Sequence, residues 1–366
     1  MTVFACTRCG TALTTPVSRV ALPAHARREG GDRFLPPLLE PGTYAVDPLW
    51  CAPPWRPWEE IGEATAAALG VHAPLPGLSV GPAGAVVVAP GDTRGTVLLP
   101  ERCEGCCASA GGLGPNLACA GCGREVGTRI DDCYRWQSVW FLAAAVRRIP
   151  ADGLFDDRVD GPSDEALDEP LDGPVPSAVE GWTVPALPPV EAPGWWSSQW
   201  EAAVGTALAD LLAASGGAPV SVPDGLLTAT FGRTLDALLP AGPPARTLAL
   251  ALAGPGLPPA PGADLLLVPR HPRTGTGWRP GTAAESPPAG GAATVPLDAA
   301  VWSYLAFPEP RTTARLPAGV ERDDPLPLRP YRPFAPDRAA LLDRLARLPA
   351  VRQPWLRAIH DRLRGG

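Results

Sequence analysis

The stretch CEGCCASAGGLGPNLACAGC, from Cys103 to Cys122, decides how the first half of this chain is organised. It contains two Cys-x-x-Cys pairs, and a third pair lies near the N-terminus in CTRCG, from Cys6 to Gly10. The chain has nine cysteines, an odd number in closely spaced pairs, which favours metal ligands over a disulfide framework. The pattern predicts a bound metal ion, and we favour zinc over iron because nothing else in the sequence indicates electron transfer.

Two of the three pairs have the same form, because each is followed directly by a glycine. Zinc held by four thiolates requires two rigid two-cysteine turns that face each other, and a glycine lets the backbone curl around the sulfurs. The two segments are Cys6–Gly10 and Cys119–Gly123, ten residues in all. They resemble the two knuckles of a zinc ribbon or of a rubredoxin-like site, a resemblance that implies a fold element and no activity. The predicted ligands are Cys6, Cys9, Cys119 and Cys122.

A local pairing is the alternative, in which Cys103 and Cys106 share the ion with the last cysteine pair. Both pairings cannot use that last pair at once. We favour the long-range pairing because its two turns match, which leaves Cys103, Cys106 and Cys107 for a second, incomplete site. A site with four thiolates has no open position for water, so the predicted zinc is structural.

The first 150 residues otherwise indicate short strands and turns. Runs of β-branched residues predict strands over 17–22 and 43–46, and a hairpin formed by 85–89 and 96–99. A helix is predicted over 57–69, with Gly70 after its last turn.

A Trp-rich helix over 132–149 is predicted to close this half, because Trp136, Val139 and Trp140 begin a run with helical spacing. Cys133 at its start is interpreted as a buried, inert thiol, and so is Cys51.

The second half shows alternating helix and strand patterns. Its third strand follows the second after a short connection, which leaves that strand's direction open. The predicted elements are helices over 195–214 and 224–239, strands over 219–222, 247–253 and 265–268, a final segment over 295–307 with a helix capped by Asp298, and a helical hairpin over 337–348 and 353–363.

The predicted fold class is therefore mixed, α+β in the first half and α/β in the second. The predicted parts are a zinc-binding β-rich module closed by the Trp-rich helix (1–150), an acidic Pro-rich linker (151–193), a small α/β domain (194–315), and a Pro-rich segment with a basic helical tail (316–366).

The composition excludes several kinds of chemistry. All 31 basic residues are arginines, so no lysine is present to bind a phosphate in a P-loop or to form a Schiff base. Residues 1–150 carry thirteen Arg and thirteen acidic residues, which disfavours tracking of a nucleic-acid backbone by the zinc module. No apolar run reaches the length of a membrane span, and we expect a cytoplasmic protein.

Three functions are compatible with this pattern. The leading expectation is a non-catalytic, zinc-stabilised protein that works through protein–protein contacts, because tryptophan is abundant and charge is low. An enzyme with an anion-binding site for a small ligand at Arg270, His271 and Arg273 is the alternative, since these residues directly follow a buried strand. Nucleic-acid binding through the zinc ribbon and the basic tail is the third.

Overall fold

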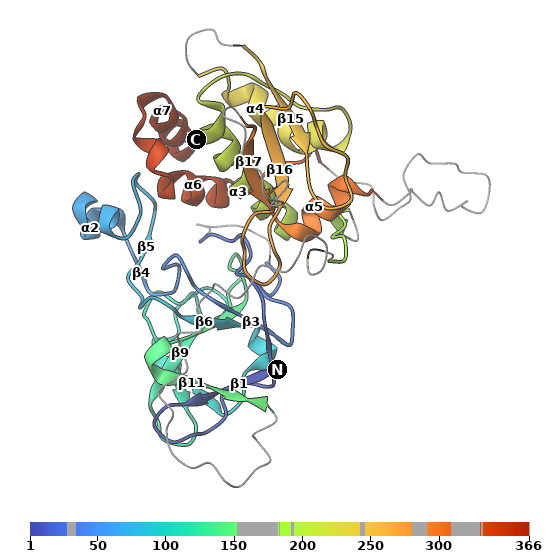
Figure 1. Cartoon of the computed structure of the whole chain (residues 1–366). Helices are drawn as coiled ribbons and strands as arrows, with labels where there is room; N and C mark the ends of the chain where they lie inside the picture. Colours follow the sequence, from blue (N-terminus) through green and yellow to red (C-terminus); the bar gives the residue numbers. More distant parts are fainter. Residues whose placement is uncertain are drawn as a thin grey trace, which may run out of the picture. The chain divides into compact units, whose positions relative to one another are not determined.

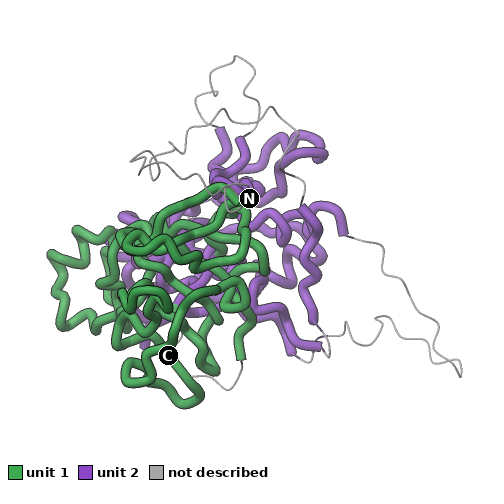
Figure 2. The backbone as a smooth tube through the Cα atoms, turned by 90° about the horizontal axis from the view of Figure 1, so that it is seen from below, with its two compact units in different colours: residues 1–23, 27–175 green, residues 24–26, 176–366 purple. Residues whose placement is uncertain are grey.

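The computed structural model describes residues 1–27, 34–151, 182, 184–191, 194–241, 246–279, 291–308, 330 and 332–365. The chain divides into two compact units (Figure 2): unit 1 comprises Met1–Pro23 and Arg27–Val175, and unit 2 comprises Ala24–Ala26 and Pro176–Gly366. Across the described residues this is a mixed α/β protein with several sheets and seven α-helices.

Unit 1 is built on a seven-stranded sheet with the order β2-β3-β6-β10-β9-β8-β7 (Figure 1). Neighbouring strands run antiparallel, except that β2 and β3 are parallel. In chain order the strands are β2 (Ser18–Arg19), β3 (Thr43–Val46), β6 (Val86–Val88), β7 (Thr96–Leu98), β8 (Leu117–Cys119), β9 (Glu125–Ile130) and β10 (Ser138–Phe141).

A second, two-stranded sheet holds the N-terminus in the core of unit 1. β1 (Thr2–Cys6) pairs antiparallel with β11 (Val146–Pro150), so that Cys6 lies opposite Val146. All five residues of β1 are buried. Phe4 and Cys6 belong to the same apolar cluster as Cys119 on β8, so the core already joins the two cysteine turns.

The predicted Trp-rich helix over 132–149 is wrong. This segment contains β10, a 3₁₀ turn at Ala143–Ala145 and β11. All four residues of β10 are buried, so both faces of the strand are apolar and the alternation that marks a strand is absent. The same apolar run therefore also matched helical spacing. Cys133 consequently lies in a turn after β9 and not at the start of a helix.

The predicted hairpin from 85–89 and 96–99 is also wrong, because β6 pairs with β3 and β10 whereas β7 pairs with β8. Between them a 3₁₀ turn carries Asp92, whose carboxylate accepts the N–H of Gly42 at 2.8 Å and the hydroxyl of Thr15 at 3.0 Å. These bonds tie the turn between β6 and β7 to residues that are distant in the sequence.

The predicted helix over 57–69 is interrupted. It forms α1 (Trp58–Ile61) and α2 (Glu63–Ala68), separated by Gly62 with a φ of 78°. A residue at this φ leaves the helical conformation, which glycine does at little cost. The two helices lie in the connection between β4 (Trp55–Arg56) and β5 (Leu78–Ser79), which pair antiparallel.

Unit 2 is an α/β unit with a four-stranded sheet in the order β14-β15-β16-β17. All its strands are parallel, which settles the direction of the third predicted strand: β16 runs parallel to β15. The strands are β14 (Val220–Ser221), β15 (Leu248–Leu252), β16 (Leu265–Pro269) and β17 (Ala293–Leu297).

Helices cover this sheet. The central helix, α3 (Ser198–Ser215), packs against β16, β17 and α6 (Arg338–Arg347). It begins later than predicted, because Trp195–Trp196 forms β13 and pairs with β12 (Val190–Glu191). A π-helical segment, Thr228–Gly232, leads into α4 (Arg233–Leu238).

The end of unit 2 matches the predicted helical elements. Asp298 caps α5 (Ala299–Ala306) by accepting the N–H groups of Ala300 at 2.9 Å and Val301 at 3.3 Å, as predicted. α6 and α7 (Pro354–Gly365) form the predicted C-terminal helix pair. Most of the predicted linker (152–181, 183, 192 and 193) and most of the Pro-rich segment before α6 (309–329 and 331) lie outside the described residues.

Among the helices of the described residues, none combines the length and the apolar character that crossing a membrane requires.

Candidate metal centre

Two cysteine turns of unit 1 have the same pattern of backbone hydrogen bonds. The carbonyl of Cys6 accepts the N–H of Gly10 at 2.9 Å, and the carbonyl of Cys119 accepts the N–H of Gly123 at 2.8 Å. In both turns the N–H of the first cysteine also donates to the carbonyl of the residue after the glycine, at 2.9 and 2.8 Å. The two glycines have φ values of 79° and 71°, which few other residues adopt. Each turn is thus a rigid loop at the end of a strand.

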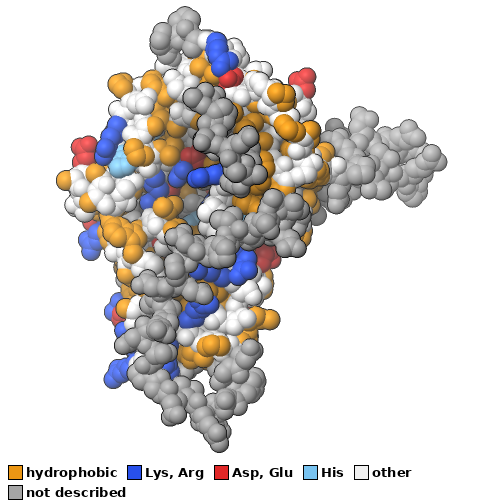
Figure 3. Space-filling model, viewed as in Figure 1, with side chains coloured by type: hydrophobic (Ala, Val, Ile, Leu, Met, Phe, Trp, Pro, Cys, Tyr) orange, Lys and Arg blue, Asp and Glu red, His pale blue; other side chains and the backbone are white. Residues whose placement is uncertain are grey.

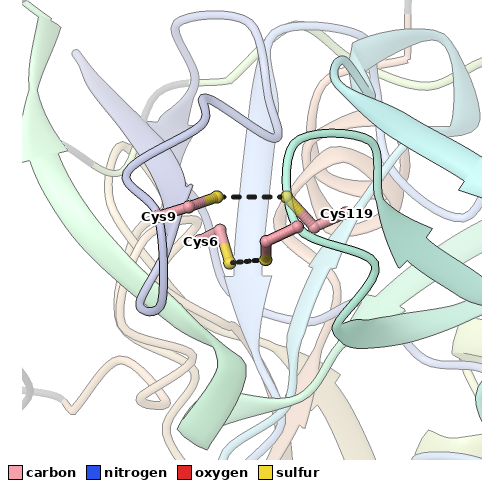
Figure 4. Close-up of side chains that lie close together, drawn as sticks. Cys6, Cys9 and Cys119 are labelled. Carbon is pink, nitrogen blue, oxygen red and sulfur yellow. Dashed lines mark hydrogen bonds between the residues drawn. The ribbon is translucent and has the colours of Figure 1, made fainter.

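These turns place four sulfur atoms opposite one another. The Sγ atoms of Cys9 and Cys119 are 3.5 Å apart (Figure 4), and those of Cys6 and Cys122 are 3.7 Å apart. All four Sγ atoms lie within 4.8 Å of one another. A tetrahedron of thiolates with Zn–S bonds of about 2.3 Å has edges of about 3.8 Å. The group therefore has the size and the donor set to hold a zinc-sized ion, with one turn contributing each pair of ligands.

Gly121 lets the two turns approach each other. A Cβ atom at this position would overlap the Oγ1 atom of Thr11 and lie 3.3 Å from the Sγ atom of Cys9. The hydroxyl of Thr11 is also 3.2 Å from that sulfur. No positive φ requires glycine at position 121, so it is the lack of a side chain that the site uses.

The surroundings of the sulfurs already favour a charged thiolate at one position. Hydrogen bonds from the hydroxyl and then the backbone N–H of Thr11 lower the pKa of Cys9 to about 6. At Cys122 the N–H of Arg124 lowers the pKa, but burial and hydrogen bonds with the other three thiols outweigh it and raise the pKa to about 11. Cys9 therefore ionises before Cys122, and a cation is needed to deprotonate Cys122 at neutral pH.

The structure places the remaining candidate ligands elsewhere. Cys106 lies with Cys107, Asp132 and Cys133, and the ligand atoms of this group are all within 4.8 Å of one another. Cys103 is outside both groups, and its thiol donates to the Leu99 carbonyl at 3.5 Å. The local pairing of Cys103 and Cys106 with the last cysteine pair is therefore not the arrangement that forms.

Sequence reasoning missed two members of this second group, Asp132 and Cys133, because it assigned both to a helix. The signal that was available is the pair of adjacent cysteines, Cys106 and Cys107, which needs ligands from another segment to complete a site. The strand β9 brings Asp132 and Cys133 to that place immediately after its last residue, Ile130.

The predicted anion-binding loop in unit 2 is a tight turn stabilised from within. His271 is 5% exposed, and its Nδ1 atom accepts the N–H groups of Arg273 and Thr274, each at 3.2 Å. Burial and then the charge of Arg273 lower the pKa of His271, so the ring is neutral at pH 7. Its ring packs edge-on against Trp182 with the centroids 5.0 Å apart.

Arg270, at the start of this turn, donates from Nε to the Gly275 carbonyl at 3.3 Å. Burial lowers its pKa, and the nearby carboxylate of Asp298 opposes that effect. The described geometry therefore gives Arg270 and His271 contacts that shape the turn.

No protein-family model, curated protein or solved structure matches this chain.

Proposed function

We propose that this chain is a zinc-stabilised protein whose unit 1 works through contacts with another protein, the ion being structural. The structural zinc ion is proposed from one observation, the set of four sulfurs on Cys6, Cys9, Cys119 and Cys122. Thiolates select zinc over magnesium or calcium, which prefer oxygen ligands. Four protein ligands also leave no open position for water, so the ion holds β1 to the β8–β9 hairpin and takes no part in chemistry.

The surface of unit 1 supports the second part of the proposal, contact with another protein. Of the ten exposed large apolar side chains among the described residues, eight are on unit 1: Met1, Phe34, Leu49, Trp50, Val80, Val97, Leu98 and Leu113. Figure 3 shows one face of the molecule, on which apolar side chains lie at the surface between charged ones. Exposed apolar side chains that adjoin one another are typical of surfaces that other proteins cover, and Val97 and Leu98 are such a pair.

β7 is the part of this surface best suited to a partner. It is an edge strand of the seven-stranded sheet, and its adjacent residues Val97 and Leu98 are 52% and 45% exposed. Because neighbouring residues of a strand point to opposite faces, both faces of β7 are open. An extended segment of another protein can pair with such an edge through its backbone and cover these side chains.

Metal analysis of the purified full-length chain tests the structural ion. The variant Cys6→Ser is expected to bind one zinc ion fewer per chain than the wild type and to unfold at a lower temperature. Cys51→Ser is the matched control, because Cys51 is a half-buried cysteine of unit 1 that lies outside both groups. Equal zinc content in Cys6→Ser and the wild type would reject this part of the proposal.

The contact surface is tested by affinity capture with the double variant Val97→Asp, Leu98→Asp. Both side chains are exposed, so the fold is expected to tolerate the change. A partner recovered with the wild type should be lost with this variant and retained with Phe307→Asp, which alters an exposed apolar residue of unit 2. A partner that binds all three chains equally would show that β7 is not the contact surface.

A further inference from the structure

A second set of soft ligands lies in unit 1, formed by the segment before β8 and the turn after β9. We propose that Cys106, Cys107, Cys133 and Asp132 form a second site for a thiophilic divalent cation such as zinc, with three sulfur ligands and one oxygen ligand. This site goes beyond the structural ion of the proposed function and uses none of its residues.

The distances fit one ion. The Sγ atom of Cys106 lies 3.6 Å from that of Cys107, 3.0 Å from that of Cys133 and 3.4 Å from Oδ1 of Asp132. Tetrahedral zinc with Zn–S bonds of about 2.3 Å and a Zn–O bond of about 2.0 Å separates sulfur from sulfur by about 3.8 Å and sulfur from oxygen by about 3.5 Å. The 3.0 Å pair needs to open slightly, and the other two distances already match.

Asp132 supplies the observation that points most directly to a cation. Its side chain is 1% exposed, and Oδ1 accepts the N–H groups of Cys107 at 3.1 Å and Cys133 at 3.0 Å. Its second oxygen, Oδ2, is buried and has no hydrogen-bond partner among the described atoms. A buried carboxylate with one unpaired oxygen is costly, and a cation beside the carboxylate offsets that cost through its charge, whichever of the two oxygens it binds.

The loop that carries the first two cysteines is fixed in place independently of any ion. The N–H of Ser109 donates to the Asp131 carbonyl at 3.1 Å, and the N–H of Asp131 donates back at 2.8 Å. The buried side chain of Asn116 donates to the Ser109 hydroxyl at 2.6 Å. Gly105 has a φ of 140°, and a Cβ atom there would lie 2.8 Å from Oδ2 of Asp132. The ligands are therefore preorganised by hydrogen bonds and by a glycine that makes room for the carboxylate.

A disulfide between Cys106 and Cys133 is the competing explanation for their short separation. Such a bond would use two sulfurs and leave Cys107 without a role and Oδ2 of Asp132 without a partner. A cation uses all four groups together, which is why we favour it.

The second site should release its ion more readily than the first. Two ligands of this site, Cys106 and Cys107, are exposed, whereas only Cys9 is exposed in the first site. One of its four ligands is also an oxygen, which thiophilic metals hold less firmly than sulfur. A chelator added to the full-length chain is therefore expected to remove one ion quickly and the other slowly.

The experiment measures zinc bound per chain after loading the reduced, full-length protein and removing excess metal. The wild type is expected to hold two ions, Cys133→Ser and Cys107→Ser one each, and Cys103→Ser two. Cys103→Ser is the matched control, because Cys103 is the sequence partner of Cys106 in a Cys-x-x-Cys pair but lies outside the group. The ion that remains in Cys133→Ser shows that unit 1 is still folded around the first site.

Cobalt loading identifies the ligands. The difference between the visible spectra of the wild type and Cys133→Ser is expected to show a tetrahedral ion with bands at shorter wavelength than those of the remaining four-sulfur site. A single ion per wild-type chain that Cys133→Ser still holds, or a loss in Cys103→Ser equal to that in Cys133→Ser, would overturn the proposal. The proposal would also be overturned if Cys107→Ser and Cys133→Ser each lost both ions, or if each kept both ions. A Cys106–Cys133 disulfide in protein kept under reducing conditions would overturn it as well. Failure of the first site appears separately, as the loss of the slowly released ion.

Discussion

Arg124 donates from Nη1 to the hydroxyl of Thr7 at 2.8 Å, and this bond joins the two cysteine turns of unit 1 without any ligand atom. Thr7 lies inside the first turn, and Arg124 directly follows Gly123 at the end of the second. Nη2 of the same guanidinium donates to the Ala144 carbonyl at 3.0 Å, next to the start of β11. The fold thus sets the separation of the turns partly through Arg124.

We expect Arg124→Ala to weaken zinc binding at the first site by about 10-fold or more, as the loss of groups that orient metal ligands commonly does. The measurement is a competition titration with a chromogenic chelator on the full-length chain. Arg102→Ala is the control, because the side chains of Arg102 and Glu125 form an ion pair 2.7 Å long and are 39% and 42% exposed. Equal weakening in both variants would show that Arg124 acts only through general stability.

Gly121→Ala is expected to damage the first site more than Arg124→Ala does. The added methyl group would collide with Thr11 and press on Cys9, so the two turns would have to separate. Zinc content per chain and thermal unfolding report the effect. Gly91→Ala is the control, since a Cβ atom there has no neighbour within 4 Å among the described residues and should leave both quantities unchanged. Unchanged zinc affinity in Gly121→Ala would mean that the turns are further apart than the structure places them.

The sequence predicted correctly those elements that are determined by interactions between neighbouring residues. Thr43–Val46 is a strand with the predicted bounds, and Asp298 caps α5 with the predicted geometry, because β-branched runs and capping side chains act on their immediate neighbours. The glycine that follows each of the two matching cysteine pairs is also a local signal. It signalled the two matching turns, although the chain between Cys9 and Cys119 gives no indication of how they meet.

The errors arose where tertiary contacts decide the structure. β10 is buried on both faces, and its apolar run therefore matched helical spacing as well as strand spacing. β6 and β7 pair with strands other than each other, and Asp92 between them is bonded to Gly42 and Thr15, residues that no local pattern connects to it. Asp132 and Cys133 were missed as members of the second cysteine group for the same reason, since the wrong helix gave no reason to place them beside Cys106 and Cys107.

Gly205→Ala is expected to destabilise unit 2 by about 1–3 kcal/mol, the usual cost of overpacking a filled interior. In an exposed helix the same change stabilises by about 0.5–1 kcal/mol. Here a Cβ atom would lie 2.6 Å from the carbonyl oxygen of Asp337, at the start of α6, so α3 and α6 would have to move apart.

The free energy of unfolding in urea measures this effect. Thr206→Ala, at the next position of α3 and only half-buried, is the control and should change stability by less than about 0.7 kcal/mol. A stabilised Gly205→Ala chain would contradict the close packing of the two helices.

His360 on α7 makes the stability of unit 2 depend on pH. Its side chain is 0% exposed, and burial lowers its pKa below the ordinary value of 6.5, although the Asp361 carboxylate 3.1 Å from Nδ1 opposes the shift. Below pH 6.5 the unfolded chain therefore binds a proton that the folded chain does not, and stability falls until the pH reaches the pKa of the folded state. Above pH 6.5 this contribution is complete.

We therefore expect His360→Gln, which cannot be protonated, to lose less stability than the wild type when the pH falls from about 7.5 to about 5. Urea unfolding followed at several pH values measures both slopes, and carboxylates that do not contact position 360 contribute equally to the two chains. His72→Gln, in unit 1, should retain the wild-type slope for unit 2. If the slopes of His360→Gln and the wild type coincide, His360 is protonated in the folded protein as readily as in the unfolded chain, and its burial has no bearing on how acid destabilises α7.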